Sequence, residues 1–288
     1  MTKFLFILAV GCAVVFWFWQ RNTSLFQLQD HGVATEKVGP PREEVDPFLG
    51  VSSVVSLPRS PQEQLTFSRT MTLGSGYRTT ASRETPLLSV FESQIQLPPF
   101  PANTSERTKK ELALLHEYTK LRTPDRLRDI QEEREMSGVR IGPEVLTTYF
   151  SSPRYTATGK LLRLLFEEIE PVILRQKVAF DRVRPDKLDP TLTTAIDVPE
   201  HPAYPSGHAT QSFAVAFLLG MINPERQSVY ERDALRIAVN REIAGVHYPS
   251  DSAAGKILAS QVVSFLIQHQ SVVKLIGEAR AEWSVTTP

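Results

Sequence analysis

Residue types and spacings between positions 177 and 251 could provide three groups that act on an anion. The first group is Lys177 with Arg184 and Pro185, and Asp181 and Arg182 lie between them. Seven residues make two helical turns, so the outer cations can share one face of a helix that the proline ends. Two cations on one face suit an anionic ligand. Taken alone, the same residues also fit an ordinary solvated, charged helix surface.

The second group is the run Tyr204-Pro205-Ser206-Gly207-His208. Pro205 and Ser206 mark the start of a helix, and Gly207 allows a ligand to approach the backbone closely. The free N–H groups and the positive dipole end of such a helix form a cradle for an oxyanion, to which the Ser206 hydroxyl adds a donor. His208, on the first turn, can reach the same anion. The competing interpretation is a capped helix with an incidental surface histidine.

The third group is Arg241, His247 and Asp251. A continuous helix would place Arg241 and His247 on different faces, but Gly245 and Pro249 indicate that the helix breaks between them. Both side chains could then converge on one point. Asp251 would open the next helix and could hold the far nitrogen of His247, which fixes its tautomer. A nucleophilic histidine needs such support. An ordinary loop between core helices is the alternative.

Helices must position these three groups, because no alternating strand pattern competes along the chain. Apolar residues recur at three- and four-residue spacing, and Pro171 could kink the longest helix. We expect a helix capped by one of residues 103–105 that ends near 122, helices at 124–135, 142–151, 157–182, 206–222, 225–243 and 251–269, and a shorter closing helix. The sequence therefore predicts an all-α domain. Its most apolar stretches, 213–222 and 257–267, are too short to cross a membrane.

Taken together, K-x6-RP, PSGH and R-x5-H-x3-D resemble the motifs of the type 2 phosphatidic acid phosphatase / vanadium haloperoxidase superfamily. All three occur in order, and the resemblance extends over roughly residues 97–264. Leu97-Pro98-Pro99-Phe100-Pro101, before a Glu/Lys-rich helix, also resembles the opening of bacterial class A acid phosphatases. The resemblance implies a helical bundle of the acid phosphatase / vanadium haloperoxidase type.

The resemblance also implies a phosphate-binding set formed by Lys177, Arg184, Ser206, Gly207 and Arg241. The three cations would neutralise the phosphoryl charge, so no metal or other cofactor is expected. Many superfamily members have serine before the third-motif arginine, where this chain has Asn240. An asparagine can still donate hydrogen bonds, and we expect it to tune the site rather than abolish its activity.

The catalytic residues that the resemblance implies are His247, His208 and Asp251. His247 would attack phosphorus and form a phosphohistidine, and Asp251 would orient it. His208 would protonate the leaving alcohol and then activate water. The sequence thus predicts a metal-independent phosphate-ester hydrolase of the acid phosphatase or lipid phosphate phosphatase type. Neighbouring cations and an anionic substrate would tune the pKa of His208 in opposite directions.

Two other functions remain open. Vanadium haloperoxidases bind vanadate in the same pocket, with the residue equivalent to His247 as metal ligand. His201 lies in a run, HPAYPSGHATQ, that resembles bromoperoxidases, where a histidine at this place supports the pocket; a plain loop residue is the alternative. Known haloperoxidases are usually much longer chains, which favours the hydrolase. The third candidate is a non-catalytic, membrane-tethered protein that binds phosphoanions.

The N-terminal residues predict a membrane anchor or signal segment over 1–21. Residues 4–19 are uncharged and nearly all apolar, and as a helix they would span roughly 24 Å, slightly less than the ~30 Å hydrocarbon core. Residues 22–96 are rich in Ser, Thr, Pro and Gly and predict a linker or loosely packed arm. Residues 97–288 would form the phosphatase-like domain, held outside the cytoplasm.

The composition limits the partners of the chain. Lys and Arg total 32 and Asp and Glu total 32, so no net charge favours nucleic acid. We expect a phosphorylated small molecule or a lipid phosphate as substrate, and soluble phosphomonoesters are favoured because lipid phosphatases of the superfamily usually cross the membrane several times. The sequence gives no oligomeric state. The single cysteine, Cys12, lies in the apolar segment and excludes an intramolecular disulfide.

Overall fold

The computed structural model describes residues 60–284 of the chain. The predicted anchor or signal segment, residues 1–21, and residues 22–59 of the predicted arm lie outside the described residues. None of the described helices is both long and apolar enough to cross a membrane.

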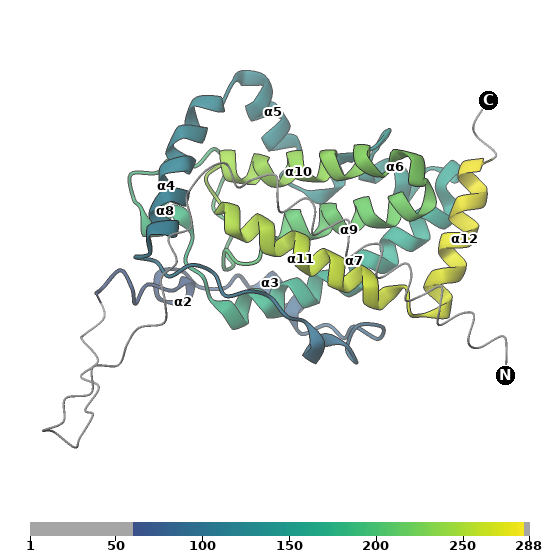
Figure 1. The fold of residues 1–288 in the computed structure, drawn as a ribbon, viewed down its shortest axis with the longest axis horizontal. Helices are drawn as coiled ribbons and strands as arrows, with labels where there is room; N and C mark the ends of the chain where they lie inside the picture. The colour runs from purple at the N-terminus through teal and green to yellow at the C-terminus, as the bar shows by residue number, and fades with distance from the viewer. Residues whose placement is uncertain (1–59, 285–288) are drawn as a thin grey trace, which may run out of the picture. The chain divides into compact units, whose positions relative to one another are not determined.

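Helices build the described part of the chain, which confirms the all-α prediction (Figure 1). The main ones are α4 (Glu106–Tyr118), α5 (Pro124–Glu132), α6 (Leu146–Ser151), α7 (Thr156–Phe180), α8 (Pro185–Leu188), α9 (Gly207–Ile222), α10 (Gln227–Ile243), α11 (Pro249–Leu266) and α12 (Gln270–Ser284). Most ends agree with the predicted ranges to within a few residues. Helix α7 continues through Pro171. The predicted helix at 142–151 begins later, because Gly142 turns at φ 73° between two short antiparallel strands, β1 (Arg140–Ile141) and β2 (Glu144–Val145).

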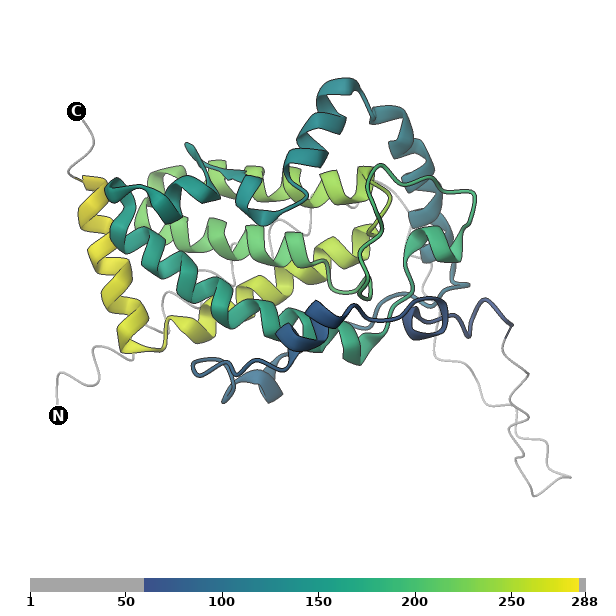
Figure 2. The same ribbon diagram turned by 180° about the vertical axis from the view of Figure 1, so that it is seen from behind.

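Helix α9 forms the centre of the bundle. It lies between α10 and α11, and α7 and α12 also pack against it (Figures 1 and 2). Because helices cover it on several sides, α9 shows no single apolar stripe, and nearly all of its residues from Ala209 to Gly220 are buried. Its first turn, which carries the second sequence group, is therefore held in place by the core.

Gly255 allows α11 to approach the start of α9. A Cβ atom at this position would lie 2.8 Å from the carbonyl oxygen of Ser206 and 2.9 Å from Cβ of Ala209. Contacts this short do not occur between real Cβ atoms and backbone, so any larger residue would push the helices apart. This close approach brings Asp251, at the beginning of α11, next to Ser206, whose N–H donates to the Asp251 carbonyl at 3.0 Å.

Residues 60–96 are packed against the bundle, which corrects the prediction of a loose arm for this part of the sequence. They belong to the same compact unit as the rest of the described chain and contain α2 (Phe67–Thr70) and α3 (Ser75–Ala81). Phe67 and Leu88 are buried, and Glu168 of α7 accepts hydrogen bonds from the N–H groups of residues 87 and 88. This segment thus packs through short helices and hydrogen bonds to α7, although its sequence lacks a long apolar periodicity.

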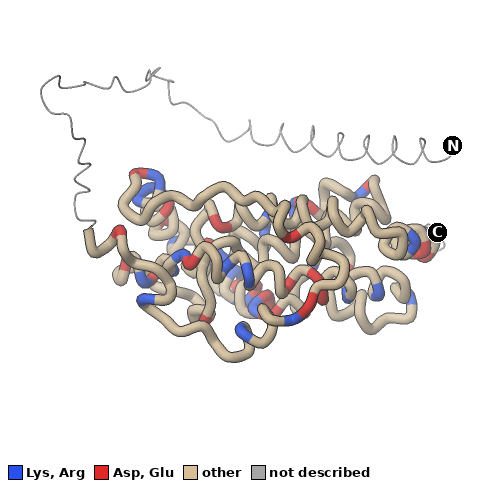
Figure 3. Tube along the Cα trace, turned by 90° about the horizontal axis from the view of Figure 1, so that it is seen from below, with Lys and Arg blue, Asp and Glu red and all other residues tan. Residues whose placement is uncertain are grey.

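The charges of the described residues are mixed. Figure 3 shows Lys and Arg interspersed with Asp and Glu along the chain, so neither sign dominates in this view. This agrees with the absence of a net charge in the sequence.

Replacing Leu88 with alanine tests whether the segment at 60–96 contributes to the core. Leu88 is 1% exposed, so Leu88→Ala should lower the free energy of unfolding by about 2–5 kcal/mol. Val90, two residues later, is 66% exposed, and Val90→Ala should change stability by less than about 0.5 kcal/mol. Urea unfolding of the full-length chain measures both values, and equal small effects would show that the segment does not pack as described.

Candidate active site

The three sequence groups meet at one end of the bundle, where α7 ends, α9 begins and α10 passes into α11. The break between α10 and α11 depends on Gly245, whose φ of 79° lies in the left-handed region. A Cβ atom there would also lie 2.9 Å from the carbonyl oxygen of Thr193. The turn ends α10 after Arg241 and places His247 in the connection before α11.

His247 is held at both ring nitrogens. Its Nδ1 lies 3.1 Å from Oδ2 of Asp251, and its Nε2 lies 3.2 Å from Nη1 of Arg184. A guanidinium can only donate, so Nε2 must accept and Nδ1 must carry the proton that Asp251 receives. This tautomer leaves the lone pair of Nε2 directed at the cationic groups, which is the state required of a nucleophile.

Asp251 is itself fixed by a cation that the sequence interpretation missed. Arg182 donates to Oδ1 of Asp251 at 2.6 Å and to the Ser250 hydroxyl at 2.7 Å, and its Nη2 lies 3.3 Å from Glu111. Burial would raise the pKa of Asp251, but Arg182 and the hydrogen bond from His247 lower it, so the carboxylate stays ionised. Arg182 is thus a buried connector between α4 and α11, and the competing interpretation of a solvated helix surface does not hold for it.

Lys177 and Arg184 are buried and are bound mainly by neutral groups. Lys177 Nζ donates to the carbonyl oxygens of Pro202 and Ala203 at 2.8 and 3.2 Å. Arg184 donates to the carbonyl oxygens of His201 and Val246 at 2.9 and 2.6 Å. Burial lowers the pKa of Lys177, and it lowers the pKa of Arg184 to about 10, so each cation would gain from a nearby anion.

His201 lies directly behind Arg184. Its Nδ1 is 2.9 Å from Nη2 of Arg184, and the ring packs edge-on against Tyr77 with centroids 4.6 Å apart. Since the guanidinium only donates, Nδ1 of His201 accepts. His201 therefore contacts the Arg184 side chain directly.

Arg241 offers unused donors. Its Nη2 donates to the carbonyl oxygen of Ile130 at 2.9 Å and lies 3.7 Å from Glu133. Its Nε and Nη1 are buried and have no hydrogen-bond partner within the described part of the chain. Buried donors are rarely left unsatisfied, so these two atoms point to a ligand with oxygen acceptors.

Glu133, at the end of α5, is a second carboxylate that the sequence interpretation missed. It is 3% exposed and forms an ion pair with Arg236. Asn240 donates to Glu133 at 2.7 Å and accepts from Arg126 at 2.8 Å. The asparagine that replaces the expected serine therefore links α5 to α10 and holds the carboxylate beside Arg241.

The start of α9 has the predicted cap. The Ser206 hydroxyl accepts from the N–H of Ala209 at 3.4 Å, and its own proton remains available to an anion. A Cβ atom at Gly207 would lie 3.8 Å from Cε of Lys177, so this residue and the Lys177 side chain are neighbours. Helix N-termini of this kind bind oxyanions.

His208 lies in the same charged environment but makes its own contacts. Its Nε2 is 3.0 and 3.2 Å from the carbonyl oxygens of Glu133 and Arg134, so Nε2 donates and Nδ1 is the basic atom. No described interaction joins His208 directly to His247. Burial lowers the pKa of both imidazoles, and neighbouring cations that include Lys177 add to this effect. Burial and Arg241 lower the pKa of His208 to about 3.

The site also lacks the side chains of a typical metal centre. Between residues 60 and 284, no three His, Cys, Asp or Glu side chains gather as metal ligands would. The groups that face one another here are cations, imidazoles and helix-start donors, and this set is suited to a tetrahedral oxyanion.

A model of the PAP2 superfamily matches residues 157–273, the stretch that holds every predicted site residue. The matched stretch makes up less than half of the chain. Glu111, Arg126 and Glu133, which support the site, lie upstream of the matched PAP2 stretch.

Two curated relatives are phosphatases by name. A non-specific acid phosphatase of Providencia stuartii is 34% identical over 82 residues, which is 28% of this chain and 33% of that protein. A decaprenylphosphoryl-5-phosphoribose phosphatase of Mycobacterium tuberculosis is 37% identical over 81 residues, which is 28% of this chain and 44% of that protein. The chain thus aligns with less than half the length of these relatives.

The crystal structure of a bacterial vanadium-dependent iodoperoxidase shares the helical fold of this chain. It superposes with a TM-score of 0.50 at 15% identity and covers 62% of this chain and 53% of the other. The likeness confirms the predicted helical architecture of the acid phosphatase / vanadium haloperoxidase type.

Arg182→Met tests the connector between Glu111 and Asp251. The variant leaves two buried carboxylates without their cation, so the free energy of unfolding should fall by about 3–5 kcal/mol. Arg128→Met is the matched control, because Arg128 forms an ion pair with Asp125 at 2.7 Å in which both side chains are exposed. That change should cost no more than about 1 kcal/mol. Equal costs in urea unfolding would contradict the role given to Arg182.

The buried histidines predict that stability falls in acid. Burial lowers the pKa of His201, His208 and His247, so below their ordinary value near 6.5 the unfolded chain binds protons that the folded chain does not. Each histidine should then lower the free energy of unfolding by at most about 1.4 kcal/mol for each unit by which the pH falls. Glu242, whose pKa burial raises to about 7, and Glu168, whose pKa burial also raises, act in the opposite direction but are two groups against three. Urea unfolding at pH 5 and pH 6.5 should therefore show lower stability at pH 5; a flat profile would contradict the described burial.

Proposed function

We propose that the chain is a phosphate-monoester hydrolase that works through a phosphohistidine at His247. The main support for this proposal is that both nitrogens of the His247 ring have a charged partner. Nδ1 contacts Asp251, and Nε2 faces Arg184. The unused donors of Arg241 and the phosphatase names of two relatives support it. The geometry suits attack by a neutral imidazole on a phosphoryl group that cations surround.

In the first half of the reaction, the phosphoryl oxygens would bind Lys177, Arg184 and Arg241 together with the donors at the start of α9. An oxygen of the substrate would take the hydrogen bond of Arg184 and free the lone pair of His247. Nε2 would then form a bond to phosphorus as the bond to the leaving oxygen breaks. Preorganised donors stabilise the charge that spreads over the equatorial oxygens, and each is commonly worth about 10²–10³ in rate.

His208 would supply the proton that the leaving alcohol needs. Without a ligand, burial and Arg241 keep this imidazole neutral at ordinary pH. The bound phosphoryl group would offset the charge of Arg241 and Lys177 and raise the pKa of His208, so that Nδ1 gains a proton. The protonated ring would donate to the leaving oxygen as the ester bond breaks.

In the second half, water would replace the alcohol. His208, now neutral, would accept a proton from the water as its oxygen bonds to phosphorus and the bond from phosphorus to Nε2 breaks. Inorganic phosphate leaves, and His247 returns to its starting state. Asp251 remains ionised throughout and stabilises the positive charge that His247 carries in the intermediate.

The substrate class and location are also proposed. Soluble phosphomonoesters are favoured over lipid phosphates, and both are compatible with the names of the relatives. We further propose that residues 1–21 tether the domain to a membrane or direct its export, with the site on the extracytoplasmic side. The alternative function is a vanadate-dependent haloperoxidase, which would use the same pocket to oxidise halides. No observation on this chain favours it.

His247→Ala should abolish hydrolysis of p-nitrophenyl phosphate by the full-length chain in metal-free buffer, with a loss of at least about 10³ in kcat. His116→Ala is the matched control, because His116 is 40% exposed and pairs with Asp189 away from the three groups. The control should keep kcat within about twofold. Acid-labile phosphate bound to His208→Ala, detected by intact mass, would support the phosphohistidine.

Two outcomes would contradict this proposal. One is hydrolysis by His247→Ala at the rate of the unaltered chain. The other is a chain that hydrolyses no ester in a broad panel and instead brominates only when vanadate is added.

A further inference from the structure

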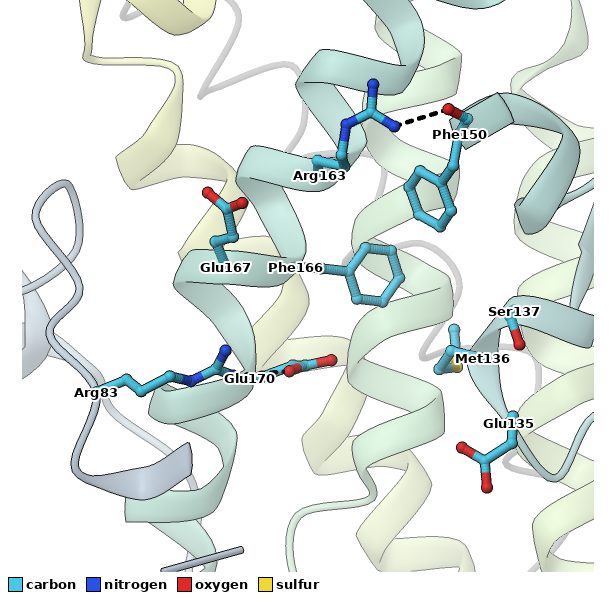
Figure 4. A pocket seen from close by; sticks show the side chains of 9 residues that line it. All are labelled: Arg83, Glu135, Met136, Ser137, Phe150, Arg163, Phe166, Glu167 and Glu170. Carbon is cyan, nitrogen blue, oxygen red and sulfur yellow. Dashed lines mark hydrogen bonds and ion pairs between the residues drawn. The ribbon is translucent and has the colours of Figure 1, made fainter. Parts of the chain in front are cut away.

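A cavity of about 400 Å³ lies near the backbone segment that contacts His208 and has no part in the steps described above (Figure 4). It is formed by α7, the segment that follows α5, and Phe150 of α6. Its volume falls within the range of pockets that hold small organic molecules. Figure 4 shows side chains from all three elements directed toward the space between them.

One end of the cavity is next to His208. Glu135 lines it and directly follows Arg134, whose carbonyl oxygen contacts Nε2 of His208 at 3.2 Å. Glu170 also lines it and lies 3.4 Å from Gln211, one turn after His208 on α9. On α7, Glu170 precedes Lys177 by seven residues, which is two turns and about 10 Å along the same face. This end of the cavity therefore lies close to His208 in the fold, on the side of its Nε2.

The other end of the cavity is apolar. The rings of Phe150 and Phe166 lie edge to face with centroids 5.9 Å apart, and Met136 lines the wall beside them. All three side chains are half-buried. A flat or bulky apolar group could bury surface here that the present neighbours leave open to water.

The charges of the cavity oppose those of the phosphate site. Three carboxylates and two guanidinium groups line it, and Arg83 already pairs with Glu170 at 2.9 Å. Arg163 donates to the carbonyl oxygen of Phe150 at 2.7 Å. The carboxylate of Glu135 is exposed and has no ion-pair partner among residues 60–284. Carboxylates accept hydrogen bonds only, so this end favours hydroxyl or ammonium donors and repels anions.

We propose that this cavity binds the alcohol part of the phosphomonoester. It selects alcohols that carry an ammonium or hydroxyl donor close to the ester oxygen and an aromatic or other apolar body beyond it. Alcohols with a second anionic group near the ester are disfavoured. The inference rests on the proposed function, because it takes the leaving oxygen to lie beside His208. The cationic site and the acidic cavity together set the direction in which the ester binds.

A matched pair of esters tests this selection with the full-length chain. L-Phenylalaninol phosphate has an ammonium group next to the ester-bearing carbon and a phenyl ring beyond it. The phosphate ester of 2-benzyl-3-hydroxypropanoic acid has the same skeleton with a carboxylate in place of the ammonium. The unaltered chain should have a higher kcat/KM for the ammonium ester. Glu135→Gln should reduce the ratio of the two values by about two- to fivefold, the range expected for one exposed charge pair.

Two further variants separate the parts of the proposal. Phe166→Leu should lower kcat/KM for both esters and leave their ratio unchanged, because it removes an aromatic surface and no charge. Glu278→Gln changes an exposed carboxylate on α12 that faces Lys274, and it should leave both values unchanged. A ratio near one in the unaltered chain, or a ratio that Glu135→Gln does not move, overturns the proposal.

Failure of the cavity and failure of the hydrolase are distinguishable. Hydrolysis of p-nitrophenyl phosphate without a preference between the two esters overturns only the cavity. If the chain hydrolyses no ester, the proposed function fails. Calorimetry of the binding of the same two esters then tests whether the cavity is a binding site. Tighter binding of the ammonium ester that weakens in Glu135→Gln supports the subsite, and equal binding overturns it.

Discussion

The burial of four cations at one end of a helical bundle constrains the rest of this structure. Lys177, Arg182, Arg184 and Arg241 are each at most 1% exposed. Removing a cation from water costs several kcal/mol unless opposite charge or good hydrogen bonds replace the water. Arg182 has two carboxylates for this purpose, whereas Lys177 and Arg184 rely on carbonyl oxygens and imidazoles. Lys177 and Arg184 therefore lack a full complement of opposite charge, which a bound oxyanion would supply.

Helices outside the matched family stretch supply much of the compensating charge. Glu111 of α4 reaches Arg182 and Ser250, and Glu133 at the end of α5 reaches Arg236 and Asn240. Each carboxylate connects an upstream helix to a helix of the site. The positions of His247 and of Arg241 thus depend on packing between α4, α5 and the bundle, and the site is a product of the whole described unit.

The sequence predicted the local parts of this arrangement well. The contact between His247 and Asp251 follows from a glycine turn and a proline-started helix, and the cap at Ser206 follows from residue type. The sequence did not predict the role of Glu111, whose partner Ser250 lies 139 positions away. Periodicity shows which face of a helix is buried, but it does not show which charged side chain from another helix contacts that face. Arg182 was missed for the same reason. The segment at 60–96 was missed because two short helices leave almost no periodic signal.

The packing of that segment has a consequence for how the chain can be divided. Ser68 donates to Asp181 at the end of α7, the N–H of Gly74 donates to the carbonyl oxygen of Glu200 at 3.0 Å, and Tyr77 covers His201. These contacts hold both ends of the loop that carries Arg182 and Arg184. A fragment that begins at residue 157, where the family match begins, would contain every motif but would lose the contacts that hold this loop. A fragment meant for engineering or for recombination between relatives should therefore begin near residue 60.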